Sequence, residues 1–354
     1  MFIMAIQNGV GILSLPTNMA KQAGHDGWIP VVISGLLSLI TSLLLIALCR
    51  RFEGQSILDI NRILFGKFIS FILNVLFILY LLFAAISNLG ILVSSIGVWF
   101  FRSTPFWVLA LYIMFPSVYL ASKGLKGVCR FNFMMVITIP VLLTLIVFNF
   151  HNLRITNLLP IGVHGIGNIV EALPDTLFAY MGFEALLFIF PFIKDKQQIG
   201  RQVMIGSGIT VLINVCLVMA SIAIFGEDLL KKRIVALVGL SRMIEVPVFE
   251  RLDLYYLATW IAAMLLAVNG YLFLSYDTVK RIFKIKSKIG PLAGIAIIVL
   301  LFTSILSEDA DRIFQENYYS GIALLIMGVL YPVLLLIITL ISRKGAGRKH
   351  EKNT

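Results

Sequence analysis

The stretches GVGILSLP at residues 9–16 and FAYMGFE at residues 178–184 decide the fold of this chain. Each places glycine inside a segment that is otherwise apolar enough to be a membrane-spanning helix. A helix interrupted at bilayer depth leaves backbone N–H and C=O groups that lipid cannot satisfy, so the interruption must line a cavity. Two interrupted helices at matching positions in two halves of a chain indicate a site for a small solute near the middle of the membrane.

The composition indicates a helical membrane protein. Of the 354 residues, 59% are hydrophobic and 13% are charged, and the mean hydropathy is +0.97, whereas soluble domains are about half apolar and about one quarter charged. Apolar runs of ~20 residues recur along the whole chain, and each is long enough to cross the hydrocarbon layer. We therefore predict a single polytopic membrane domain over residues 1–354, with no separate soluble domain and no cleavable signal peptide.

The pattern predicts an all-α integral membrane protein with ten transmembrane helices. Five lie in residues 1–150 and five in residues 168–341, and a basic cytoplasmic tail follows at 342–354. With an odd number of helices per half, the second half enters the membrane in the opposite sense. The predicted architecture is thus a 5+5 inverted repeat with discontinuous helices 1 and 6, as in LeuT/APC-like folds. The predicted spans are 2–24, 28–48, 69–97, 105–121, 131–150, 169–192, 202–224, 254–276, 291–306 and 318–341.

The basic residues predict the orientation. The net charge of +11 is concentrated in short loops between spans, as membrane topology requires, and does not indicate a nucleic-acid partner. On the side of the two termini lie 20 of the 29 Lys and Arg residues, so both termini are predicted to be cytoplasmic. The external loop 225–253 is basic too, and its interrupted apolar stretch suits a cap over the cavity, a docking segment or a loop along the membrane surface.

The GVGILSLP stretch provides candidate backbone contacts for a ligand. Gly9 and Gly11 lack a Cβ where the backbone must approach a solute, and Pro16 restarts a helix. The N-terminus of that restarted helix suits a substrate carboxylate because it presents unpaired N–H groups. The alternative interpretation is that the two glycines only allow close packing of helices.

The FAYMGFE stretch contains Glu184, the acidic residue placed in the middle of a predicted span. A charged group at this depth costs at least ~2.5 kcal/mol, so it should face a cavity or a partner. Gly182, two residues earlier, allows the helix to break. Glu184 could pair with a substrate ammonium, carry a coupling proton or brace the unwound segment, and the residues leave these alternatives open.

Other polar groups in the spans are possible pocket walls, namely Asn88, Asn269 and Tyr271. Single polar residues at this depth also make hydrogen bonds between helices, which is the alternative for each. The segment LDINRILF at 58–65 is predicted to be an amphipathic helix at the membrane interface.

The residues give no sign of an enzyme, a metal site or a cofactor. The chain lacks a phosphate-binding GxxxxGK[ST] loop and a Ser-His-Asp arrangement. The four histidines lie outside the predicted spans, and none has a carboxylate at helical spacing, so no metal site is expected. Cys49, Cys129 and Cys216 are expected to be free thiols.

These motifs resemble those of the amino acid–polyamine–organocation transporter superfamily. Within it, the chain most resembles the B subunits of spore germinant receptors, the spore germination permease branch. The strings that match are GVGILSLP with DGW at 26–28, NLLP at 157–160, FAYMGFEALLFIFPF at 178–192, FERLDLYYLATWI at 249–261 and EDA at 308–310. Members of that family usually carry more residues before the first span than the eight that precede Gly9, so we expect a start assigned too late.

The resemblance implies a receptor subunit that binds a small germinant, often an amino acid, in a permease-like pocket. It would act with a larger A subunit and a lipoprotein C subunit in the inner membrane of the dormant spore. The implied ligand contacts, by position, are Gly9, Val10, Gly11, Ile12, Ala179, Tyr180, Gly182 and Glu184. The alternative is a secondary transporter that moves an amino acid by coupling to protons or sodium.

Overall fold

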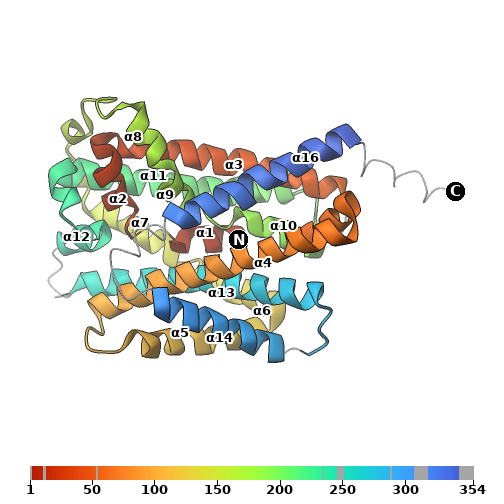
Figure 1. Ribbon diagram of the computed structural model, residues 1–354. Helices are drawn as coiled ribbons and strands as arrows, with labels where there is room; N and C mark the ends of the chain where they lie inside the picture. The colour runs from red at the N-terminus through yellow and green to blue at the C-terminus, as the bar shows by residue number, and fades with distance from the viewer. Residues whose placement is uncertain are drawn as a thin grey trace.

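Helices account for the architecture of the computed structural model (Figure 1). The structure describes residues 2–10, 13–52, 55–233, 235–244, 251–287, 289–306 and 318–342. Its elements are α1 (Phe2–Val10), α2 (Leu15–Ala23), η1 (Gly24–Gly27), α3 (Trp28–Arg51), α4 (Ile57–Trp99), α5 (Phe106–Ser122), α6 (Gly124–Met135), α7 (Thr138–Phe148), η2 (Phe150–Asn152), η3 (Ile155–Leu158), α8 (Gly165–Glu171), α9 (Leu173–Phe178), η4 (Phe183–Ala185), α10 (Leu186–Ile189), η5 (Phe190–Phe192), α11 (Ile199–Lys231), α12 (Ala236–Arg242), α13 (Leu252–Ile282), α14 (Ile289–Leu306), the π-helical η6 (Leu325–Leu330) and α16 (Tyr331–Ser342).

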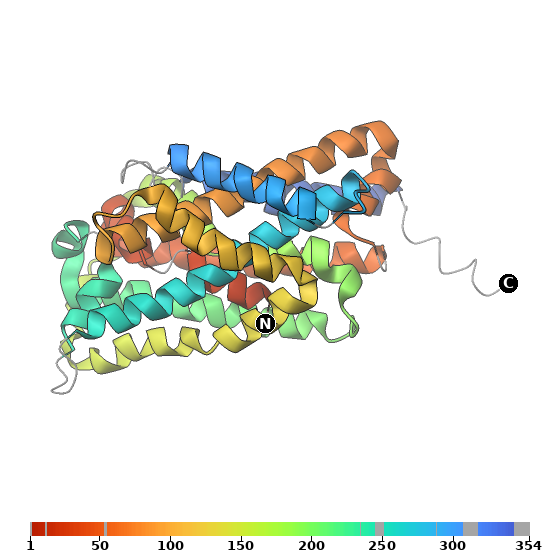
Figure 2. The ribbon, with the colours of Figure 1, turned by 90° about the horizontal axis from the view of Figure 1, so that it is seen from below.

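Long apolar helices identify the chain as a membrane protein. Six helical stretches among the described residues are long and apolar enough to cross a membrane, and a bent pair could form a seventh. Two further apolar helices, Phe106–Ser122 and Ile289–Ile305, are shorter than these. In Figure 2, seen from below, most of the long helices run in similar directions. The ten-helix count and the inverted repeat remain predictions.

The two predicted interruptions are present in the structure. The first helix stops at Val10 and resumes at Leu15, with Pro16 at the start of α2, while Gly11 and Ile12 lie outside the described residues. The second interruption follows Phe178, where the chain bends by 49° between its two helical parts. Gly182 has φ of +127°, a backbone conformation that favours glycine.

Two further glycines place segments that the sequence analysis singled out. Gly66, with φ of +74°, separates the predicted interfacial helix from the rest of α4, and Asn61 in that helix packs inward against Asn74. Gly226, with φ of +70°, kinks α11 before its last residues. The predicted loop 225–253 contains α12, which is buried against α13 and α7. The apolar residues of α12 therefore pack on other helices of the chain, and the three interpretations of the whole loop stay predictions.

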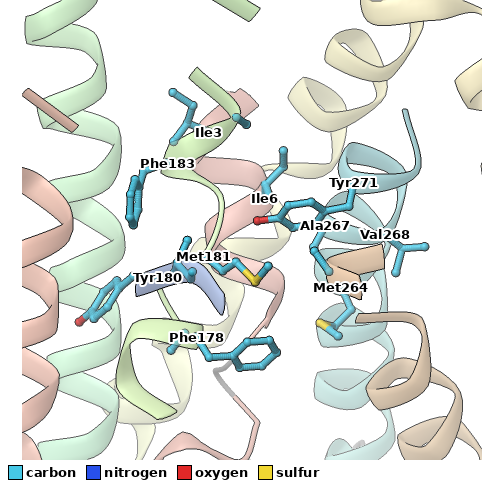
Figure 3. Packing of buried hydrophobic residues seen from close by; sticks show 14 of the residues in the cluster. Ile3, Ile6, Phe178, Tyr180, Met181, Phe183, Met264, Ala267, Val268 and Tyr271 are labelled. Atoms are coloured by element: carbon cyan, nitrogen blue, oxygen red, sulfur yellow. The ribbon is translucent and has the colours of Figure 1, made fainter. Parts of the chain in front are cut away.

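Close packing surrounds α1, which contacts α13 and α11. Ile6 lies between the interrupted segment around Met181 and the face of α13 that carries Tyr271 (Figure 3). A Cβ built on Gly9 would lie 2.7 Å from the backbone oxygen of Ala263, and one built on Gly182 would lie 2.8 Å from a methyl group of Ile6. The alternative interpretation of Gly9, that it permits close helix packing, is therefore supported.

We expect Gly9→Ala to destabilise the protein by ~1–3 kcal/mol, because the added methyl group meets the backbone of α13 and cannot be accommodated by a rotamer change. The measurement is thermal unfolding of the purified protein in detergent. Gly208→Ala is the matched control, because a Cβ at Gly208 in α11 would meet no atom within 4 Å. Equal unfolding temperatures for the two variants would contradict the packing assigned to Gly9.

Candidate functional site

Glu184 is fully buried where the second interrupted helix resumes. The residue lies in η4, two residues after Gly182, and a Cβ built on Gly328 in the π-helical η6 would lie 3.5 Å from the Cβ of Glu184. The structure thus brings a carboxyl group to the interruption itself. This is the position at which the sequence predicted it.

Three donors hold the Glu184 carboxylate. The hydroxyl groups of Tyr80 and Tyr271 donate to Oε1 over 2.7 and 2.6 Å, and the backbone N–H of Gly182 donates to Oε2 over 2.9 Å. The two tyrosines belong to α4 and α13, so the carboxylate connects the interruption to both helices. The ion pairs found among the described residues do not include Glu184. The group is therefore a buried hydrogen-bond acceptor without a protein cation beside it.

The freed backbone of the interruption is satisfied by a second group of side chains. Nε2 of Gln7 donates to the carbonyl oxygen of Tyr180 over 3.1 Å, and Oγ of Ser207 donates to Oε1 of Gln7 over 3.1 Å. Gln7 and Ser207 are completely or almost completely buried. These bonds link α1, the interruption and α11, so a carbonyl freed by the broken helix has a partner without lipid contact.

The predicted site residues do not all point to one place. The hydroxyl group of Tyr180 donates to the backbone oxygen of Val31 in α3 over 3.0 Å, and its ring points away from Tyr271 in Figure 3. Its backbone remains at the interruption, next to the buried Ala179. The side chain of Val10, like Gly11 and Ile12, falls outside the part of the chain that the structure describes.

Of the possible pocket walls, Tyr271 is at the site and the two asparagines are buried elsewhere on α4 and α13. Asn88 donates to the carbonyl oxygen of Ala84 over 2.8 Å, in its own helix. The side-chain oxygens of both Asn88 and Asn269 are buried with no protein hydrogen-bond partner. Buried polar atoms are ordinarily hydrogen-bonded, so these two oxygens are free acceptors among the described residues.

Tyr80 and Gln7 are site residues that the sequence analysis missed. Both are polar side chains inside predicted spans, and that signal was available in the sequence. The sequence does not show which residue each side chain contacts, because Tyr80 bonds to Glu184 across 104 positions and Gln7 bonds to Tyr180 across 173.

A cavity of about 240 Å³ lies next to this network. It is lined by residues of α1, α6 and α11 and by the segment after the interruption, among them Ile3, Cys129, Gln202 and Ser207. Ser207 thus borders the cavity and also bonds to Gln7. Cys129 is a free thiol, as are Cys49 and Cys216, which confirms the expectation for the three cysteines.

Comparison with known proteins identifies the family of this chain. The family model described as "Spore germination protein" matches residues 1–312. The chain is 26% identical to spore germination protein GerQB of Bacillus cereus over 341 residues, which cover 95% of the chain and 93% of that protein. It is 24% identical to spore germination protein B2 of Bacillus subtilis (strain 168) over 345 residues, which cover 96% and 94%.

A solved structure supports the fold. The manganese transporter of Eremococcus coleocola, in complex with an aromatic bis-isothiourea substituted compound, aligns with a TM-score of 0.59 at 14% sequence identity. The alignment covers 95% of this chain and 77% of the transporter. At this identity the likeness shows a shared transporter fold.

The chain is therefore a membrane protein with a transporter-type helical fold. It belongs to the spore germination protein family, in the branch formed by the B subunits of germinant receptors. The resemblance drawn from GVGILSLP and FAYMGFE is confirmed. The related proteins are spore germination proteins of the permease type, and none of those reported above is an enzyme by name.

We expect Tyr80→Phe and Tyr271→Phe each to lower stability by ~1–3 kcal/mol, because each removes a donor from a buried carboxylate while leaving the ring in place. The measurement is the unfolding temperature of each purified variant. Tyr112→Phe is the control, because the side chain of Tyr112 on α5 is 76% exposed and its hydroxyl group should contribute little. A shift no larger than that of the control would contradict the bonding described for Glu184.

Proposed function

We propose that the chain is the permease-like B subunit of a spore germinant receptor. It binds a small germinant, most simply an amino acid, between the two interrupted helices. It signals germination together with an A subunit and a lipoprotein C subunit in the inner membrane of the dormant spore. In this proposal ten helices cross the membrane as a 5+5 inverted repeat, and both termini are cytoplasmic. The family membership and the transporter fold support this assignment.

The observation that carries the proposal is the environment of Glu184. Its carboxylate is fully buried, has hydrogen-bond donors and lacks a cation among the described residues. A buried charge is costly unless it is paired, so this carboxylate attracts a group that brings a positive charge and further N–H donors. The ammonium group of an amino acid has both properties. The N-terminus of α2, across the first interruption, would receive the carboxylate of the same ligand.

Two tyrosines share one oxygen atom of Glu184, and this sharing suggests how ligand binding would be signalled to the helices. Tyr80 of α4 and Tyr271 of α13 both donate to Oε1 of Glu184, so an ammonium group that takes this oxygen competes with both tyrosines. Binding would then weaken the connection between the interruption and these two helices. The ligand shifts an equilibrium between two arrangements of the helices through its different affinity for each, and the partner subunits sense the shift.

The second candidate is a secondary transporter that couples an amino acid to protons or sodium. The fold shared with a manganese transporter favours it, as does the cavity that reaches Ser207 from one side. Sensing and transport use the same pocket, so the distinction lies in whether the protein releases its ligand on the other side.

We expect Glu184→Gln to weaken binding of an amino acid by about 10- to 100-fold, because a hydrogen bond to a charged group contributes ~1.5–3 kcal/mol. Amino acids and nucleosides are screened by thermal shift on the purified chain, and the affinity of each active compound is then compared between variants. Glu171→Gln is the control, because Glu171 is an exposed carboxylate on α8.

Unchanged affinity in Glu184→Gln would contradict the site. Uptake of the radiolabelled compound into proteoliposomes then separates the two functions. Binding without uptake supports the receptor subunit, and concentrative uptake driven by a proton or sodium gradient supports the transporter.

A further inference from the structure

A second group of chemically active side chains lies away from Glu184. It consists of His25 in η1, His164 just before α8, and Glu227 just after the kink of α11. Their helices gather at one end of the bundle, where α2, α8 and α12 are found in Figure 1. The side chains are 12%, 25% and 21% exposed. The group is therefore sheltered by protein yet open to small ions.

The three side chains converge on one carboxylate oxygen. Nδ1 of His25 lies 2.9 Å and Nε2 of His164 lies 3.1 Å from Oε2 of Glu227. One ligand atom of each residue lies within 4.8 Å of the other two. Zinc binds imidazole nitrogen and carboxylate oxygen at ~2.0–2.2 Å in a tetrahedral site, which places neighbouring ligand atoms about 3.4 Å apart. The two distances to Oε2 of Glu227 are within about 0.5 Å of that separation.

The backbone around the group is shaped for this approach. Gly24 has φ of +57°, and a Cβ there would lie 2.1 Å from Nε2 of His164 and 2.7 Å from Cδ of Glu227. No residue other than glycine would let these side chains meet. Asp26 accepts hydrogen bonds from the backbone N–H groups of Gly162 and His164 over 2.8 and 3.3 Å, which holds the loop that carries His164.

The two oxygens of the Glu227 carboxylate have different partners, and the backbone N–H of His25 also donates to Oε2, over 3.2 Å. Nζ of Lys231 contacts Oε1 of Glu227, whereas both imidazole rings face Oε2. The Lys231 side chain is 36% exposed and has room to turn towards water when a cation binds. Among the described residues, Nε2 of His25 is buried without a hydrogen-bond partner, and the ring contacts Glu227 through Nδ1 and packs on His164.

We propose that His25, His164 and Glu227 form a binding site for one divalent transition-metal ion, with zinc as the best match to two imidazoles and a carboxylate. A fourth position remains for water. The bound ion would connect the end of α2, the loop before α8 and the end of α11, three segments that are remote in sequence. This inference rests on the geometry of the group alone and does not depend on the proposed function.

The test is zinc binding by the purified full chain in detergent, with a purification tag that contains no histidine. Equilibrium dialysis against zinc chloride, with magnesium in excess, should give about one zinc ion per chain. His25→Gln and His164→Gln should each weaken binding at least tenfold. His151→Gln is the matched control, because His151 is an exposed histidine in η2, outside the group, and its replacement should leave binding unchanged.

A second readout separates loss of the site from loss of the fold. Cobalt(II) in place of zinc should give visible absorption bands of a tetrahedral site in the wild type and in His151→Gln, and these bands should be absent from both cluster variants. Unfolding temperatures without metal establish that the variants are folded. The proposal is overturned if the wild type binds no zinc, if the cluster variants bind zinc as the wild type does, or if His151→Gln loses binding equally.

Discussion

The site depends on one buried carboxylate and the hydrogen bonds it accepts. Glu184 lies where a helix is interrupted, and its two oxygens take donors from α4, from α13 and from the interrupted segment itself. In lipid every freed backbone group needs a partner, so an unwound segment is stable only if the surrounding helices supply polar groups at that depth. Here Gln7 bonds the carbonyl group of Tyr180, and Glu184 accepts the N–H of Gly182 while the two tyrosines hold its carboxylate. The ligand proposed for this site would compete with the same bonds.

The features that the sequence predicted are those carried by local pattern. The interruptions after Val10 and after Phe178 follow from glycine and proline in otherwise apolar runs, and the depth of Glu184 follows from its place within such a run. Membrane insertion follows from composition alone. Each of these inferences needs only residues that are neighbours along the chain.

The features that the sequence did not predict depend on which helices meet. Tyr80 and Gln7 are ordinary polar residues in their spans until the fold brings them to the interruption. The group around Glu227 shows this most clearly. The spacing of the histidines predicted no metal site, yet the structure brings His25 and His164 to Glu227 across 202 and 63 positions. The burial of α12 similarly depends on its contacts with α13 and α7.

The π-helical turn η6 has a consequence for how the last helix can move. A π turn contains one residue more than an α turn, so its conversion to regular α-helix would rotate the following α16 by about 100° about its own axis. Gly328 in this turn lies against Glu184, and Tyr331, just after it, donates to Asn61 over 2.7 Å. The two arrangements differ by a whole residue, so the helix would change register in a single step and not by gradual bending.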